Sequence, residues 1–183
     1  MVSTNIDRQF IPAFGYDPTS VRYGLAWLLN SDDETLVQFH STRGNRHESI
    51  YYELEAIFGK DIAYKSSKED RITIDAKIVR LLPNDIHTNI LVNNDALGKK
   101  EIKIKNERII HLITDKRLPF LQGPIRLLAC WANSEELEEL ESRYHISNML
   151  VITWDEEEIK DWKQKMPSQF KEYDLPRWWT WEY

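Results

Sequence analysis

Residues 127–158 read LLACWANSEELEELESRYHISNMLVITWDEEE, and their pattern is the strongest indication of the fold class. Two nearly continuous apolar runs are typical of strands that are covered on both faces, which predicts strands over 125–131 and 149–154. The glutamate-rich segments that follow have helical spacing and predict helices over 134–145 and 156–165. Strand–helix–strand–helix at this spacing predicts a parallel βαβα unit with a right-handed crossover.

The polar residues after these two strands have two interpretations. Asn133 with Glu136, and Asp155 with Glu158, have the spacing of capping boxes, and glutamates also favour the positive end of a helix dipole. The carboxyl ends of parallel strands meet at one sheet edge, where open α/β sheets bind ligands. Asn133, Ser134 and Asp155 are therefore candidate residues for a small polar ligand. The glutamates disfavour phosphate there, because an anion site needs bare N–H groups and glycines.

The N-terminal part of the chain alternates between helical and extended patterns. An Asp-Pro pair and apolar residues at helical spacing predict a helix over about 18–30. A short strand is expected over 35–41, followed by a loop over 41–45. The next amphipathic pattern predicts a helix over 46–58, which Gly59 is well placed to end.

The middle of the chain has a different pattern, rich in alternating Ile and Val. Residues 61–67 and 71–82 predict a first antiparallel hairpin, and 101–105 with 108–114 predict a second one. Prolines and a glycine make 115–124 a loop. The expected fold is therefore α/β, with two hairpins and the parallel βαβα unit in one mixed sheet and helices packed on it.

Length and composition indicate one globular domain over residues 1–183. The chain is 42% apolar and 30% charged, which is ordinary for a folded protein. No apolar run approaches the ~20 residues that a membrane-spanning helix needs, so we expect no membrane partner. The first residues lack the basic start and apolar stretch of a signal peptide. The single cysteine, Cys130, lies within an apolar run and is expected to fill the core, which together with these features predicts a cytoplasmic protein.

The net charge of −6 is distributed unevenly. Residues 1–59 carry 4 Lys or Arg and 8 Asp or Glu, net −4; residues 60–126 carry 14 and 9, net +5; residues 127–183 carry 6 and 13, net −7. An acidic chain is not a general nucleic-acid binder, because that affinity comes from neutralising phosphates. The basic 60–126 region still leaves local contact with a nucleic acid open.

Motifs for common catalytic chemistries are missing from the sequence. None of the 5 histidines pairs with another His or Cys at zinc-site spacing. There is no GxSxG, no Walker A loop and no GxGxxG, so serine-based and P-loop chemistry lack support. We expect no tightly bound cofactor.

One carboxylate–lysine pattern remains in the basic region. Asp75 lies in ITIDAKI, and Glu101 and Lys103 follow in EIK. Period two places Glu101 and Lys103 on one strand face. This pattern resembles that of PD-(D/E)xK nucleases, and the resemblance implies that Asp75 and Glu101 hold Mg²⁺ while Lys103 assists the attacking water. The competing interpretation is a solvated strand face with alternating charges.

The C-terminal residues, about 166–183, form an aromatic tail that ends in RWWTWEY. Trp178, Trp179, Trp181 and Tyr183 are expected either to pack on their own domain or to contact a protein partner or a second copy, since aromatic residues are enriched in such interfaces. The first hypothesis is therefore a non-catalytic interaction or regulatory module, and the alternative is a Mg²⁺-dependent nuclease.

Overall fold

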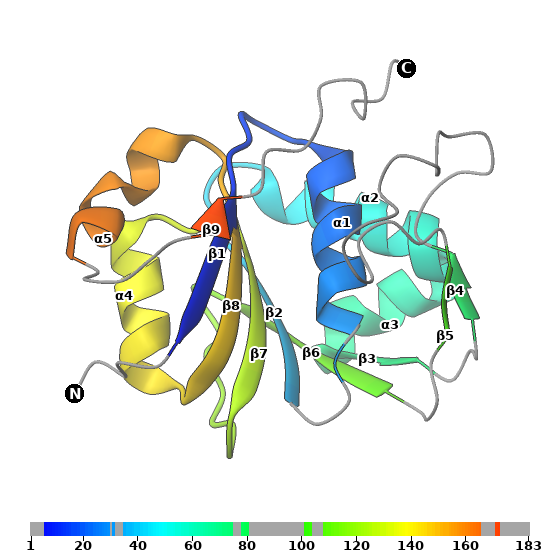
Figure 1. The fold of residues 1–183 in the computed structure, drawn as a ribbon. Helices are drawn as coiled ribbons and strands as arrows, with labels where there is room; N and C mark the ends of the chain where they lie inside the picture. Colours follow the sequence, from blue (N-terminus) through cyan, green and yellow to red (C-terminus); the bar gives the residue numbers. More distant parts are fainter. Residues whose placement is uncertain are drawn as a thin grey trace.

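The fold is α/β, with helices packed on a mostly parallel mixed sheet (Figure 1). The computed structural model describes residues 6–29, 31, 35–74, 78–80, 101–103, 108–165 and 171–172. The strands are β1 (Asp7–Ile11), β2 (Thr35–His40), β3 (Arg71–Ile74), β4 (Ile78–Arg80), β5 (Glu101–Lys103), β6 (Arg108–Thr114), β7 (Ile125–Cys130), β8 (Ile146–Ile152) and β9 (Lys171–Glu172). The helices are α1 (Pro18–Leu29), α2 (Arg46–Phe58), α3 (Lys60–Glu69), α4 (Ser134–Arg143), the 3-10 helix η2 (Glu156–Ile159) and α5 (Lys160–Lys165).

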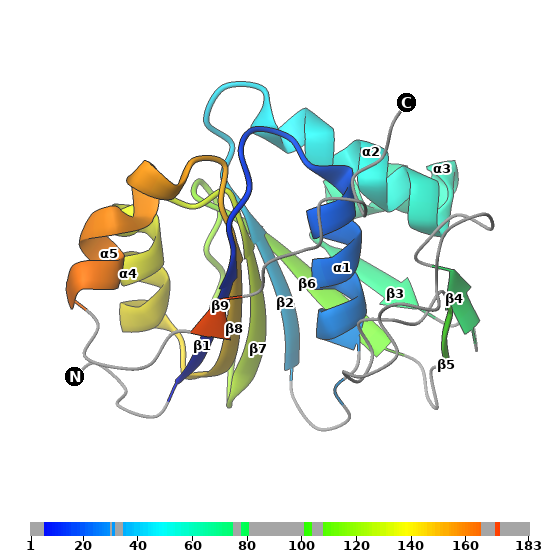
Figure 2. The same cartoon turned by 45° about the horizontal axis from the view of Figure 1, so that its top comes forward.

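The seven-stranded sheet has the order β3-β6-β2-β7-β8-β1-β9. All neighbouring pairs are parallel except β3 with β6, which is antiparallel. Strands β4 and β5 form a separate antiparallel pair. The carboxyl ends of β1, β2, β7 and β8 therefore meet at one edge, where the connections that leave β1, β2 and β8 lie together (Figure 2).

Helices cover both faces of the sheet, so the molecule has three layers (Figure 1). Helices α1, α2 and α3 lie on one face and pack over a cluster that includes Leu36, Leu128 and Leu150. Helices α4 and α5 lie on the other face, over a cluster that includes Val37 and Leu127. Alternate residues of β2 and β7 thus contribute to opposite clusters, as expected for strands buried on both faces.

Helix α1 approaches the sheet closely at Gly24. A Cβ atom added there would lie 2.6 Å from Leu128 Cδ1 and 2.9 Å from Ile152 Cδ1. Glycine is the residue that permits this separation between helix and sheet. Arg22 of α1 and Tyr16 both bond to the buried carboxylate of Glu53 on α2, which joins the two helices.

The predicted βαβα unit is confirmed, since β7 and β8 are parallel neighbours with α4 between them and η2 and α5 after them. The predicted helices over 18–30 and 46–58 and the strand over 35–41 are also confirmed.

Both predicted hairpins are wrong. Residues 61–67 belong to helix α3, where Ala63 and Ser66 are buried at a spacing of three residues, which is a helical and not an extended pattern. Residues 108–114 form β6, which lies between β2 and β3 and does not pair with β5. Strand β1 was not predicted.

None of the helices in the described part of the chain has the length and the hydropathy that spanning a lipid bilayer requires.

Candidate binding site at the carboxyl edge of the sheet

The β2–α2 loop, residues 41–45, brings two arginines to the carboxyl edge of the sheet. The Ser41 N–H bonds to the Cys130 carbonyl at 3.1 Å, which extends the β2–β7 pairing by one residue. Thr42 donates from its backbone N–H and its hydroxyl to Asp115 Oδ1, at 2.7 and 2.8 Å, and so attaches the loop to the end of β6. Gly44 turns the chain with a φ of 59°, and α2 begins two residues later.

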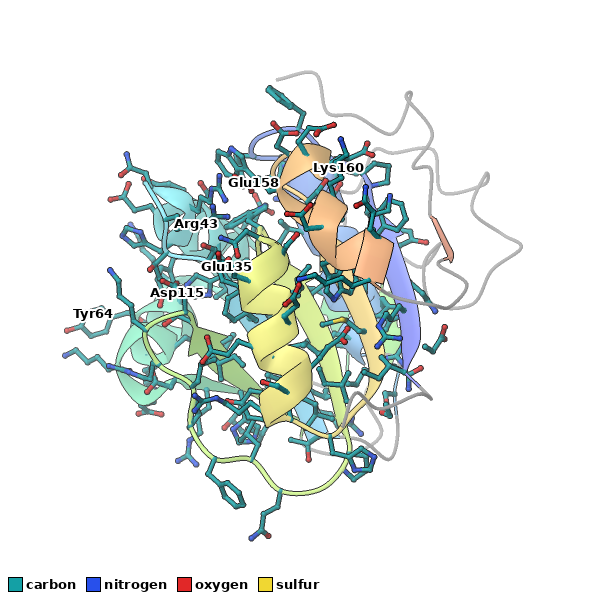
Figure 3. The ribbon with its side chains drawn as sticks, turned by 90° about the vertical axis from the view of Figure 1, so that its left-hand side faces the viewer. Arg43, Tyr64, Asp115, Glu135, Glu158 and Lys160 are labelled. Atoms are coloured by element: carbon teal, nitrogen blue, oxygen red, sulfur yellow. The ribbon has the colours of Figure 1, made fainter. Side chains whose placement is uncertain are left out.

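Arg43 and Arg46 converge on one carboxylate, that of Glu158 from η2. Figure 3 labels Arg43 and Glu158 at this edge of the sheet. Arg46 makes a bidentate contact, with Nη2 2.9 Å from Oε1 and Nη1 3.1 Å from Oε2. Arg43 Nη2 lies 3.2 Å from Glu158 Oε2. The cluster is partly open to water, with 36% of the Arg43 side chain and 24% of the Glu158 side chain exposed.

Glu158 is held in its charged form by the two guanidinium groups. Burial pushes the pKa of Glu158 upward, but hydrogen bonding from Arg46 and the charge of Arg43 outweigh burial and keep this pKa below its ordinary value. Within the described part of the chain, the Glu158 carboxylate bonds to these two arginines and to no other side chain.

Glu136 is the second carboxylate beside Arg43, at 3.6 Å from its Nε. Unlike Glu158, it is fixed by the architecture of α4, because its Oε2 accepts from the Asn133 N–H at 2.8 Å and its Oε1 accepts from the Ser41 hydroxyl at 3.1 Å. Two arginines and two glutamates leave the cluster electrically neutral.

Trp131 supplies the backbone against which both arginines lie. Its carbonyl accepts from Arg43 Nη2 at 3.2 Å and from Arg46 Nη1 at 3.1 Å. To present this carbonyl, the residue adopts a φ of 63°, a left-handed conformation that is strained for a large side chain. The buried Trp131 ring makes edge contacts with Tyr16 and Trp154, and the Arg46 guanidinium lies 4.6 Å from the centre of a Trp154 ring.

The two arginines are suited to holding a carboxylate or a phosphate, and in this structure they hold the carboxylate of Glu158. Arginine offers paired N–H donors that match two oxygens of such a group, and it stays charged at any physiological pH. The Trp154 ring attracts the Arg46 guanidinium and the Trp131 carbonyl accepts from it, and both contacts help to position its donors.

The predicted ligand residues Asn133, Ser134 and Asp155 lie at this same edge, where each caps or joins a helix. Asn133 and Glu136 form the predicted capping box of α4. The Ser134 hydroxyl donates to the Glu158 carbonyl at 2.9 Å and accepts from the Trp162 N–H at 3.0 Å. Asp155 caps η2 by accepting from the Glu157 N–H at 3.1 Å.

The second predicted capping box, Asp155 with Glu158, is wrong, because the Asp155 side chain accepts from the Glu157 N–H and not from that of Glu158. Asp155 does act as a cap, but the Glu158 side chain bonds to Arg43 and Arg46 across the sheet edge. The charge of the two arginines outweighs one uncharged N–H donor as a partner for the carboxylate.

Of the proposed nuclease residues, Asp75 lies outside the described residues, whereas Glu101 and Lys103 belong to strand β5. The backbone of β5 places Glu101 opposite Arg80 and Lys103 opposite Ile78 of β4. Among the residues that the structure describes, no group of three or more His, Cys, Asp or Glu is placed to hold a metal ion. The described residues do not include the aromatic residues of the tail, which are Trp178, Trp179, Trp181 and Tyr183. They also leave out most of the 81–107 part of the basic region.

Two further groups are buried near the edge. Cys130 is buried as predicted, and burial raises its pKa to about 12. His40, at the end of β2, contacts the Tyr51 ring with a centroid distance of 5.8 Å. Burial, and to a lesser degree the nearby His47, lower the pKa of His40 to about 4, so the ring is neutral at pH 7.

Comparisons with protein-family models, with curated proteins and with solved structures found no match to this chain. The fold class is therefore established by the sheet and its helices alone, as α/β with a mostly parallel mixed sheet.

Sequence reasoning missed Arg43 and Arg46 as site residues, because it assigned Arg43 to a connecting loop and Arg46 to the start of the helix over 46–58. The available signal was STRGNR over residues 41–46: a glycine and two arginines between a buried strand and a helix start. A loop of this kind places its side chains at the carboxyl edge.

Proposed function

We propose that this chain is a non-catalytic interaction module that recognises an acidic group of a protein partner at Arg43 and Arg46. The observation that carries the proposal is the convergence of two arginines on Glu158, a partly exposed carboxylate from a separate short helix. Glu158 occupies the position that a partner's carboxylate or phosphate would take.

An incoming carboxylate or phosphate can replace the Glu158 carboxylate at the two arginines. An incoming group with two or more oxygens can accept the same donors, and the released Glu158 returns to water. Glu136 is the less exchangeable carboxylate, because it also caps α4. The tethered Glu158 competes as an intramolecular ligand, whose effective concentration reaches the millimolar range, so a lone small anion binds weakly.

A titration of the ¹⁵N-labelled chain with sodium acetate and with sodium phosphate, at constant ionic strength, tests this proposal. Amide and arginine Nε–H signals of residues 41–46 should shift in a saturable way, and the stronger anion identifies the group recognised. Arg43→Gln with Arg46→Gln should abolish the shifts. Arg143→Gln is the matched control, since Arg143 pairs with Glu139 on the exposed side of α4. Equal shifts in wild type and the double variant contradict the proposal.

The aromatic tail is a second proposed contact of the same module. Trp178, Trp179, Trp181 and Tyr183 would supply apolar anchors for a partner or a second copy. Light scattering of the full chain and of a chain truncated after Leu175 tests this role. An unchanged mass, together with unchanged partner binding, removes it.

The alternative function is a Mg²⁺-dependent nuclease that uses Asp75, Glu101 and Lys103. It is supported by the extended backbone of β5, in which residues two apart share a strand face. Cleavage of DNA or RNA by the wild-type chain that requires Mg²⁺ and is lost in Asp75→Asn would favour it, and cleavage that persists in this variant would exclude it. The cytoplasmic location expected from the sequence stays a prediction, which a fractionation experiment can test.

A further inference from the structure

Phe14 is an exposed aromatic side chain on the β1–α1 connection, at the same sheet edge as the two arginines. It is 85% exposed, which leaves nearly all of a large apolar surface in water. Single exposed apolar residues are common on protein surfaces, but one that lies beside a charged site can add an apolar contact to a ligand that is held there.

The backbone around Phe14 is attached to the end of β8. The Ala13 N–H donates to the Thr153 hydroxyl at 2.7 Å, and the Gly15 N–H donates to the Trp154 carbonyl at 2.7 Å. The side chain of Trp154 in turn contacts Arg46. Phe14 and Arg46 are thus both linked to Trp154, one through the backbone and the other through the ring.

A partner that used the arginines alone would be held weakly, because Glu158 competes for the same donors. A second contact, made by burying apolar surface, compensates for this competition. Fully burying one Leu-sized side chain contributes ~1.5–3 kcal/mol, or roughly tenfold or more in affinity. Among the described residues of this edge, Phe14 offers the largest exposed apolar side chain.

We propose that the partner presents a peptide segment in which one acidic residue is flanked by a large apolar residue. The acidic group would bind Arg43 and Arg46, and the apolar side chain would contact Phe14. This inference rests on the proposed function. The neighbouring Glu156 and Glu157 are exposed and would repel further acidic residues, so a segment with a single acid is favoured over a polyacidic one.

Two capped tripeptides test the inference on the full chain: acetyl-Leu-Glu-Leu-amide and acetyl-Gly-Glu-Gly-amide. The leucine peptide should bind wild type about tenfold more tightly in an NMR titration, as expected from the burial of one apolar side chain. Phe14→Ser should remove this preference. Phe120→Ser is the matched control, since Phe120 is also 85% exposed but lies on the β6–β7 loop, and it should keep the preference.

The possible outcomes separate this inference from the proposed function. Equal affinity for the two peptides, with binding that still requires Arg43 and Arg46, overturns the apolar contact and leaves the arginine site intact. Binding of neither peptide in an arginine-dependent way overturns both. Loss of the leucine preference in Phe120→Ser, or its survival in Phe14→Ser, overturns the assignment to Phe14.

Discussion

Glu141 is predicted to be the most sensitive polar position on the α4 face of the sheet. Its carboxylate accepts from Arg8 Nε at 2.8 Å, from Arg8 Nη2 at 3.0 Å and from Trp162 Nε1 at 3.1 Å, and so joins β1, α4 and α5. The side chains of Arg8 and Glu141 are 2% and 4% exposed. Removing one member of a buried ion pair costs ~3–5 kcal/mol, because the other charge loses its partner without regaining water.

Glu141→Leu should therefore lower the free energy of unfolding by ~3–5 kcal/mol. For a chain of this length, each kcal/mol corresponds to ~2–4 °C in Tm, so Tm should fall by roughly 6–20 °C. Urea unfolding followed by circular dichroism measures the first quantity and calorimetry the second.

Replacing both members of the pair should cost much less stability than replacing Glu141 alone. Arg8→Met combined with Glu141→Leu should recover most of the stability, because two apolar side chains replace the pair. Glu139→Leu, on the exposed side of the same helix, should change stability by no more than ~0.5 kcal/mol. A loss below ~1 kcal/mol in Glu141→Leu, or a double variant as unstable as the sum of the single ones, refutes the interpretation of this pair.

Three other predictions concern buried residues. The pKa of His40, lowered by burial to about 4, lies below its unfolded value of about 6.5. The stability that the neutral His40 ring contributes is therefore fully present above pH 6.5. As the pH falls from 6.5 to 4, about 3 kcal/mol of this stability is lost. The free energy of unfolding of His40→Leu, measured in urea, should therefore change less with pH over this range than that of wild type. An equal change in the two proteins contradicts this. Gly24→Ala should destabilise by about 1 kcal/mol in urea unfolding, since overpacking against Leu128 outweighs the gain in helix propensity; a more stable variant contradicts this. Cys130 should react with a thiol reagent at pH 8 only after unfolding, because burial raises its pKa to about 12; rapid labelling of the folded chain contradicts this.

The C-terminal βαβα unit could be predicted because its local signals agree. Its strands are covered on both faces, so their apolar runs are nearly continuous, and the capping box at Asn133 and Glu136 marks the start of α4. The helices α1 and α2 have comparable start or stop signals, with a proline at Pro18 and a glycine at Gly59.

The middle of the chain could not be predicted in the same way, because strand pairing there depends on distant segments. The alternation in β3 is genuine, with Ile72 and Ile74 buried, but its partner is β6 and not the preceding residues. Helix α3 ends at Asp70, which takes a left-handed conformation with a φ of 56°, a C-terminal signal more common for glycine or asparagine.

The arginine site depends on still longer separations. Arg46 and Glu158 are 112 residues apart in the sequence, and no local pattern links them. The spacing of Glu158 from Asp155 instead suggested a cap, because the spacing rule contains no information about a cation from another element.

The most direct test of the arginine site is the effect of removing its internal competitor. Glu158→Ala should increase the affinity of the chain for acetate or phosphate, by roughly tenfold if the competition is worth about 1.4 kcal/mol. Glu157→Ala removes the same charge from the adjacent exposed position, where the side chain lies 3.6 Å from Lys160, and should leave the affinity nearly unchanged. We expect the affinity to increase in Glu158→Ala alone. An equal increase in both variants, or no increase in either, would mean that the Glu158 side chain does not occupy a binding site for an external anion.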